Sequence, residues 1–408
     1  MFAVTAVCTQ AAQAQTFTAI YNFTGEGDGD GPSNLTMDRE GNLYGTAVKA
    51  GTGPCSFGGV PGCGVVFKLT HSGSGWRLVP LYEFQGGNDG AFPPNGVVFG
   101  PDGSLYGTTS PSGSNYGVVF KLTPPATACK TALCPWTETV LYRFTGGADG
   151  GQPTGVLVFD GAGNIYGTTA VGGQLDCDPS SGCGVVYKLA VATGWTQSIL
   201  HAFTGGNDGE RPYGLIFDQA GNLYGATEFQ GGYAGTVFEL TPAGSGWTNK
   251  TLYSFQSEGD GIEPMAGVVF DPASNLYGTT TAGGYDQAGT VFMLTPAYGS
   301  WTETVLYSFI GSYGGGPHAI LTIDGDGNLY GTTFSDGAGI DGGSVFKLAP
   351  GGGWTETDLH LFDGRDGLHP VSNVVMDANG NLYGTASGGG AKQCIDPGGC
   401  GNVWEITP

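Results

Sequence analysis

The residues best suited to chemistry in this sequence stand beside one repeated proline. The proline recurs in seven copies of a tandem motif, at Pro32, Pro93, Pro153, Pro212, Pro264, Pro317 and Pro370. The residues that flank it differ from copy to copy, and those with the most useful side chains are Phe92, Gln152, Arg211, Tyr213, Glu263, His318 and His369. Loop positions that vary within a fixed frame are suited to contact a ligand. We therefore take these seven residues as the candidate ligand-binding set.

Two histidines in this set suggest a sharper hypothesis. His318 and His369 belong to successive copies, so they can converge, and Glu263 stands in the copy before them. A histidine pair with a carboxylate is suited to metal binding or to acid–base catalysis. The alternative is a pair of solvated loop histidines, because nothing in the sequence fixes their geometry. The sequence contains no G-x-S-x-G, H-E-x-x-H, P-loop or C-x-x-C motif, so it names no catalytic residue.

An Asp-Gly pair precedes the repeated proline in six copies, with the aspartate at Asp28, Asp89, Asp149, Asp208, Asp260 and Asp366. Asp-Gly favours a tight corner, and proline limits backbone donors where a strand begins. The same carboxylates are also the ligand type that calcium prefers, and Asp28 with Asp30 is the best local candidate for such a site. We expect turns, with no metal and no cofactor, and keep calcium as the alternative.

Eight cysteines form four close pairs in loops: Cys55 and Cys63, Cys129 and Cys134, Cys177 and Cys183, Cys394 and Cys400. Disulfides that close inserted loops in an exported protein are the simplest account. Zinc is the alternative, but the spacings are irregular and no histidine lies near the pairs. We expect four disulfides within these pairs, with bridges between neighbouring loops, for instance from Cys55 to a C-terminal cysteine, as the alternative pairing.

These residues must be positioned by the repeat itself. Its core, Leu or Ile followed by Tyr-Gly, recurs with the tyrosine at Tyr44, Tyr106, Tyr166, Tyr224, Tyr277, Tyr330 and Tyr383. Each copy holds four short apolar or alternating runs separated by Gly, Pro, Asn and Asp, which is typical of short strands and tight turns. The first two runs are separated by a five-residue turn, such as Asp271 to Asn275, whose polar residues we interpret as structural. No run shows a helical period, so the prediction is an all-β, seven-bladed β-propeller with four-stranded blades.

The two ends of the repeat array predict how the ring closes. Residues 16–23 read TFTAIYNF, a fourth strand without the first three, and residues 401–408 read GNVWEITP, a third strand without a fourth. The N-terminal strand can therefore complete the last blade, which leaves no exposed edge between the first and last blades. Residues 15–408 are expected to form one propeller domain and a monomer.

Composition and charge exclude several partner classes. The chain has 13 Lys plus Arg against 35 Asp plus Glu, a net charge of −22. Such a surface repels phosphate backbones and anionic lipids, which excludes nucleic acid and an anionic membrane. No apolar run is long enough to span a bilayer. Residues 1–14 are apolar or small and end in Ala-Gln-Ala, which predicts a secretory leader and a secreted, extracellular, cell-surface or periplasmic protein.

The sequence motifs of the repeat resemble those of a known family. Its copies include GNLYGTT at 327–333, GTVFMLTP at 289–296 and WTETVLYSF at 301–309. These motifs resemble the bacterial tandem-repeat family called GloVer, described with a choice of C-terminal anchors. The resemblance covers nearly all of the chain after the leader and implies an exported bacterial protein with a propeller-like repeat. It brings no catalytic residues. The sequence as far as Pro408 contains no anchor segment, which departs from the family pattern, so the resemblance does not imply surface attachment. The spacing of the repeated motifs also resembles that of NHL-type and streptogramin-lyase-like propellers, a similarity at the level of the fold only.

Three functions fit these observations. The leading hypothesis is a secreted binding module whose ligand, an extracellular glycan or protein, lies on the face that carries the Asp-Gly-x-x-Pro corners. The second is an extracellular lyase or hydrolase that uses Glu263, His318 or His369 at the mouth of the central channel. The third is a structural surface protein without a ligand.

Overall fold

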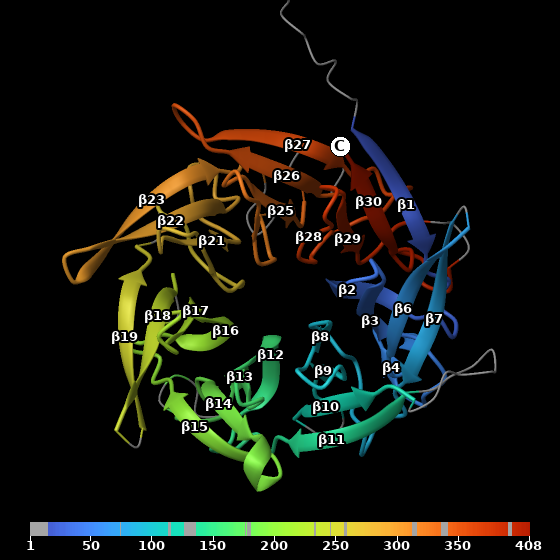
Figure 1. The fold of residues 1–408 in the computed structure, drawn as a ribbon, viewed down its shortest axis with the longest axis horizontal. Coiled ribbons are helices and arrows are strands. Elements are labelled where there is room, and N and C mark those ends of the chain that lie inside the picture. The colour runs from blue at the N-terminus through green and yellow to red at the C-terminus, as the bar shows by residue number, and fades with distance from the viewer. Residues whose placement is uncertain are drawn as a thin grey trace, which may run out of the picture.

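The structure is a computed structural model in which seven four-stranded antiparallel sheets form a closed ring (Figure 1). It describes residues 15–73, 75–112, 116–125, 136–175, 177, 181–231, 234–244, 246–256, 259–311, 316–335, 342–390 and 394–408. Among these residues the helical content is one short 3-10 turn, Val191–Thr193. The predicted all-β, seven-bladed propeller is therefore confirmed.

Each blade is a meander of four consecutive strands, and the first strand is the one nearest the channel (Figure 1). Blade 1 contains β2 (Asp30–Met37), β3 (Leu43–Lys49), β6 (Val65–Ser72) and β7 (Gly75–Glu83). Blade 2 contains β8 (Val97–Phe99), β9 (Leu105–Thr108), β10 (Val118–Thr123) and β11 (Thr137–Arg143). Blade 3 contains β12 (Gly151–Phe159), β13 (Ile165–Val171), β14 (Val185–Ala190) and β15 (Thr196–Ala202). Blades 4 and 5 contain β16 (Glu210–Phe217), β17 (Leu223–Phe229), β18 (Thr236–Ala243) and β19 (Gly246–Ser254); and β20 (Val269–Phe270), β21 (Leu276–Thr280), β22 (Thr290–Ala297) and β23 (Ser300–Ser308). Blades 6 and 7 contain β24 (Thr322–Ile323), β25 (Leu329–Thr333), β26 (Ser344–Ala349) and β27 (Thr355–Leu361); and β28 (Val375–Met376), β29 (Leu382–Ala386), β30 (Asn402–Thr407) and β1 (Thr16–Asn22). A small hairpin, β4 (Ser56–Phe57) with β5 (Val60–Pro61), lies in the loop after β3.

The entry to the first strand differs from the sequence expectation in three blades. The repeated proline was expected to precede the strand, but in blades 1, 3 and 4 it lies inside β2, β12 and β16. Pro32, for example, pairs with Ala47 across β2 and β3. The innermost strand has a neighbour on one side only, so a proline without an N–H costs no ladder hydrogen bond on its free edge.

The Leu-Tyr-Gly signature is explained by three separate contacts. In blade 5, Leu276 is fully buried, and the Tyr277 hydroxyl donates a hydrogen bond of 3.1 Å to Asp271 in the preceding turn. A Cβ built on Gly278 would come within 2.5 Å of the Phe292 ring, so the glycine makes room for the aromatic residue of the third strand. Asp271 also accepts hydrogen bonds from the Asn275 side chain and backbone, which confirms the structural interpretation of this turn.

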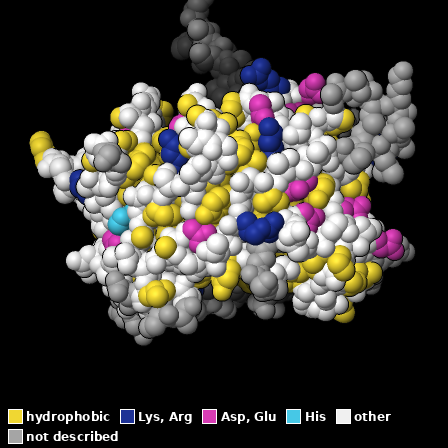
Figure 2. Space-filling view, turned by 90° about the horizontal axis from the view of Figure 1, so that it is seen from below, with side chains coloured by type: hydrophobic (Ala, Val, Ile, Leu, Met, Phe, Trp, Pro, Cys, Tyr) yellow, Lys and Arg dark blue, Asp and Glu magenta, His cyan; other side chains and the backbone are white. Residues whose placement is uncertain are grey.

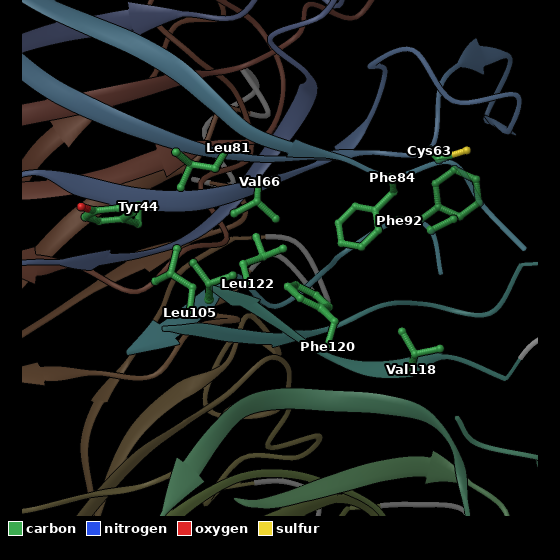
Figure 3. Packing of buried hydrophobic residues seen from close by; sticks show 12 residues of the cluster. Tyr44, Cys63, Val66, Leu81, Phe84, Phe92, Leu105, Val118, Phe120 and Leu122 are labelled. Carbon is green, nitrogen blue, oxygen red and sulfur yellow. The ribbon is translucent and has the colours of Figure 1, made fainter. Parts of the chain in front are cut away.

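Adjacent blades are held together by buried apolar side chains. Figure 3 shows this between blades 1 and 2, where Tyr44, Val66 and Leu81 approach Leu105 and Leu122. The repeated tryptophan adds an edge-on contact to the Leu-Tyr-Gly tyrosine of the preceding blade, as for Trp136 against Tyr44. Each blade thus buries one face against the next blade, so contacts between neighbouring blades contribute to the stability of the ring.

The ring closes as the sequence predicts. Strand β1 pairs with β30 in antiparallel register from Thr16–Thr407 to Asn22–Asn402, so the N-terminal strand completes blade 7. An ion pair adds to this seam, because Lys49 of blade 1 lies 3.0 Å from Asp396 of blade 7 and 3.9 Å from Asp30. The Asp30 side chain is fully buried. Ring closure therefore uses both a strand ladder and a charged contact.

Carboxyl groups also stand at three seams between outer strands, at Glu138, Glu303 and Glu356, and burial raises the pKa of each. Glu138 of β11 faces Asp89 of the preceding blade, and Glu303 of β23 faces Asp260. Burial and these neighbouring charges raise the pKa of both Glu138 and Glu303 to about 7. Blade 3 has Gln197 at the equivalent position, where its amide donates to the Asp149 carbonyl oxygen and accepts from Tyr142.

These seams predict an acidic optimum for stability. A carboxyl whose pKa is raised on folding favours the folded state most at low pH, and that contribution is lost as pH rises from about 4.5 towards 7. The turn aspartates oppose this at lower pH: burial alone would raise the pKa of Asp271, but hydrogen bonds from Asn275 and Tyr277 lower it. Stability from such groups is lost as pH falls below about 4. We expect the melting temperature to be highest near pH 4.5.

The control is the pair of substitutions Glu138→Gln and Glu303→Gln, which copy the residue already present in blade 3. Between pH 5 and pH 8, the melting temperature of the double variant is expected to fall by less than that of the parent chain, as measured by scanning calorimetry. An unchanged pH dependence in the double variant would show that these carboxyl groups do not set the optimum.

The outer wall of the ring carries few charges. Figure 2 shows isolated Lys, Arg, Asp and Glu side chains among hydrophobic and uncharged polar ones. Among the residues described, no helix has the length and apolar character needed to cross a membrane.

Candidate functional site

One face of the ring gathers the variable loops. The start of β16 lies beside the end of β17, because Glu210 pairs with Phe229 and Pro212 with Thr227. The corners between blades and the loops between second and third strands therefore share this face, which we call the loop face. The loops closed by the Cys55–Cys63, Cys177–Cys183 and Cys394–Cys400 disulfides are on it, since each connects a second strand to a third.

The residue before the repeated proline has an unusual backbone. Its φ is positive in six blades, at Gly31, Phe92, Gln152, Arg211, Glu263 and His369. This conformation strains any residue other than glycine. It directs the N–H toward a carbonyl oxygen at the end of the second-to-third loop of the preceding blade, and the two atoms form a hydrogen bond of 2.7–3.2 Å. The six bonds, donor first, are Gly31 to Cys400, Phe92 to Cys63, Gln152 to Tyr116, Arg211 to Cys183, Glu263 to Ala234 and His369 to Gly342. The strain thus has a structural cause, which is an interblade bond.

The residue after the proline faces a central cavity of about 430 Å³ at the mouth of the channel. Tyr213, Met265 and His318 line it from blades 4, 5 and 6. Of the seven predicted residues, only Tyr213 and His318 are in the lining; Phe92, Gln152, Arg211, Glu263 and His369 are not. Pockets of this size accept small molecules or the end of a larger one.

A buried carboxyl group stands beside Tyr213. Glu228, near the end of β17, is 7% exposed and accepts a hydrogen bond of 3.3 Å from the Tyr213 hydroxyl. Arg211 lies 3.7 Å from Glu228 and covers the ring of Phe229. Burial raises the pKa of Glu228, Arg211 lowers it, and the charge of Glu263 raises it further, so the net shift is upward.

Glu263 is therefore close enough to Glu228 to influence its ionisation, although the two residues come from adjacent blades. The Thr281 hydroxyl lies 3.3 Å from the Glu263 carboxylate and 3.2 Å from its carbonyl oxygen. Two carboxylates, a guanidinium, a phenol and a hydroxyl group are thus brought together by blades 4 and 5. Such a group can bind several hydroxyls of one ligand.

The two predicted histidines both contact the ring of Phe334. His369 stacks on the ring of Phe334, with centroids 4.3 Å apart and planes 7° from parallel. His318 approaches the same ring at 5.4 Å with a tilt of 57°. Both histidines therefore contact Phe334, and the three rings form an aromatic platform contributed by blades 6 and 7. Among the residues described, no three His, Cys, Asp or Glu side chains form a group suited to a metal ion.

The two remaining predicted residues lie in other blades. Phe92 of blade 2 is buried and packs at 5.2 Å against Phe57 of the β4–β5 hairpin. Gln152 of blade 3 has an exposed side chain. We name the residues of blades 4 to 7 the mouth cluster: Arg211, Tyr213, Glu228, Phe229, Glu263, Thr281, His318, Phe334 and His369.

Sequence reasoning missed Glu228, Thr281 and Phe334. Each is the third residue after Leu-Tyr-Gly, a position that holds Val48, Ser110, Ala170 and Ser387 in the other blades. The sequence contained a signal for them, because this position varies as freely as those beside the proline. It was overlooked because the position belongs to the apolar run of the second strand.

The candidate calcium residues serve the fold. Asp28 accepts hydrogen bonds from the Tyr21 hydroxyl and from the backbone and side chain of Thr24. Asp30 is buried, with Lys49 nearby, and burial raises its pKa to about 6. Lys49 already supplies the positive charge at this place.

Three of the four expected disulfides are confirmed, with Cα atoms 4.9 Å apart for Cys55–Cys63 and 5.7 Å apart for Cys177–Cys183 and Cys394–Cys400. Cys129 and Cys134 lie outside the described residues. A disulfide leaves no thiolate for zinc, so the zinc alternative does not apply to the three described pairs.

A family model described as the Gloeobacter/Verrucomicrobia repeat matches residues 6–175 and 178–396. The chain belongs to this family. The two matched segments together span most of the ring, from β1 to the loop between β29 and β30. Comparison with curated proteins finds no match.

Among the solved structures similar to this chain, one with a TM-score above 0.5 supports the fold and nothing beyond it. A Bacteroides protein described as the extracellular domain of a one-component system from B. thetaiotaomicron is 12% identical, with a TM-score of 0.58 over 97% of this chain. The present chain spans 40% of the length of that structure. A Thermus protein described as an oxidoreductase (glucose dehydrogenase) is 15% identical over 96% of this chain and 99% of its own, with a TM-score of 0.45.

Proposed function

We propose that this protein is an extracellular binding module whose ligand, a glycan, binds at the mouth cluster. The observation that supports this most directly is an asymmetry within a repeated frame. All seven blades share the same core contacts. At the positions that flank the repeated proline and at the third residue after Leu-Tyr-Gly, however, every charged or aromatic residue other than Phe92 stands in blades 4 to 7. Repetition accounts for the frame but not for this gathering.

A glycan fits the chemistry of the mouth cluster. Sugar rings offer C–H faces that pack on aromatic residues, and hydroxyl groups that pair with carboxylates and guanidinium groups. Phe334 with His369 provides the first kind of contact, while Glu228, Arg211 and Glu263 provide the second. The disulfides support an oxidising, extracellular location.

The test is isothermal titration of the full chain with a panel of soluble glycans, including cello-, xylo-, manno-, chito- and β-1,3-gluco-oligosaccharides. Glu228→Ala and Phe334→Ala each install the residue that blade 3 already has, Ala170, so the frame tolerates both changes. We expect each variant to bind its glycan at least about tenfold more weakly.

The matched control is Ser110→Ala, which makes the same kind of change at the same position of blade 2. It is expected to leave affinity unchanged. If no glycan in the panel binds, or if all three variants bind as the parent chain does, the proposed function is wrong.

A second candidate function is cleavage of the bound glycan. Glu228 favours it, because burial raises its pKa, and a carboxyl that keeps its proton closer to neutral pH can act as a general acid. Incubating each bound glycan with the protein and measuring new reducing ends tests this. Turnover that disappears in Glu228→Gln would support cleavage, and no turnover would leave the module as a binder.

A further inference from the structure

Large apolar side chains are exposed at the tips of the second-to-third loops. Five loops each expose one: Phe57, Tyr116, Leu175, Tyr285 and Ile395. Tyr285 is the most exposed of these, at 89%. These tips surround the mouth cluster on the loop face, and each comes from a different blade.

Several of these tips are held rigidly. Phe57 belongs to the β4–β5 hairpin, which the Cys55–Cys63 disulfide closes. Ile395 lies between Cys394 and Cys400, and Leu175 stands two residues before Cys177. An apolar group that is already ordered loses little conformational entropy when a ligand covers it.

In blade 5 the loop joins the mouth cluster to the outer strand. It begins at Thr281, whose hydroxyl contacts Glu263. Three residues later, a Cβ on Gly284 would lie 3.1 Å from the Ser308 side chain at the end of the outermost strand, β23. Tyr285 follows directly. The loop therefore leads from the mouth of the channel to its rim, with the exposed tyrosine at the outer end.

We propose that the ligand is a long polysaccharide that runs outward from the mouth cluster across blade 5 and stacks a sugar ring on Tyr285. This inference rests on the proposed function and adds a second subsite to it. The tips are single side chains on separate loops rather than the contiguous apolar patch expected for a protein partner. A tyrosine ring offers a broad apolar face with a polar edge, which suits one sugar unit. The cavity of about 430 Å³ holds only part of such a chain.

The experiment compares short and long fragments of the same panel glycans, disaccharide against hexasaccharide, by isothermal titration. We expect the hexasaccharide to bind at least about tenfold more tightly than the disaccharide. Tyr285→Ala should remove most of this advantage and leave disaccharide affinity unchanged.

The matched control is Tyr298→Ala. Tyr298 is an equally exposed tyrosine of the same blade, but it stands in the turn between β22 and β23, on the opposite face. It should have no effect on either fragment. Equal affinity for both lengths, or equal effects of the two tyrosine variants, would overturn the second subsite while leaving the mouth cluster standing. Failure of every fragment to bind would overturn the proposed function itself.

Discussion

Replacing Lys49 with alanine is expected to lower the free energy of unfolding by about 3 kcal/mol. Lys49 is a cation within reach of Asp30, whose side chain has no exposed surface and whose carboxyl oxygens accept no hydrogen bond from the residues that the structure describes. Removing one partner of a buried pair leaves the other charge without compensation, which costs more than the pair contributes. The loss of the contact to Asp396 also weakens the seam between blades 1 and 7. Guanidinium unfolding with the disulfides intact measures the effect.

The equivalent residues of another blade suggest a second substitution that should restore the stability of this variant. Asp30 pairs with Lys49 across β2 and β3, while the equivalent pair in blade 5 is Ile262 with Ala282. The double variant Asp30→Ile, Lys49→Ala copies the apolar pair and should recover most of the lost stability. The penalty of Lys49→Ala alone should be smaller at pH 5 than at pH 8, because burial raises the pKa of Asp30 to about 6 and protonation removes its charge. Equal penalties at both pH values would contradict this account.

Phe292→Ala is expected to cost about 4 kcal/mol of unfolding free energy. Phe292 is fully buried, and its ring packs on the backbone of Gly278 and edge-on against Phe255 at 5.0 Å. Neither glycine nor the neighbouring strands can fill the space that the ring leaves, so the cavity remains. Thermal and denaturant unfolding should agree on a large loss.

Phe334→Ala provides the comparison, since it is the same substitution at a half-buried position of the mouth cluster. We expect it to cost about 1 kcal/mol, which is roughly the value of one aromatic contact, and to reduce glycan binding. If Phe334→Ala destabilised the protein as much as Phe292→Ala, Phe334 would belong to the frame and would lose its place in the proposed site.

The fold could be predicted because each frame residue repeats and has one local reason for doing so. Tyr277 reaches an aspartate six residues earlier, and Gly278 lies under an aromatic residue of the next strand. Seven repetitions of such short-range relations fix blade number, strand order and ring closure. The point at which the first strand begins was not predictable in the same way. A proline is tolerated inside a strand only when its nitrogen faces the unpaired edge of the sheet, and which edge is unpaired depends on the tertiary structure.

The site was only partly predictable for the opposite reason. Tyr213 and His318 were expected at the channel mouth and line the cavity there. The contact between His369 and Phe334 depends on how two blades are placed, and no periodicity within one repeat reports that placement. Glu228 was hidden because a charged residue in an apolar strand resembles an interruption of the pattern, although it occupies the position from which a strand reaches the loop face.

The interblade bond made by the residue before the repeated proline, seen in six blades, uses main-chain atoms only. The side chain at that residue is therefore exchangeable without loss of the bond, as Phe92, Gln152, Arg211, Glu263 and His369 already illustrate. A library randomised at these corners, and at the third residue after each Leu-Tyr-Gly, would retain the ring while changing what it displays. The molecule is in this sense a natural display scaffold, and new specificities could be selected from it without redesigning the core.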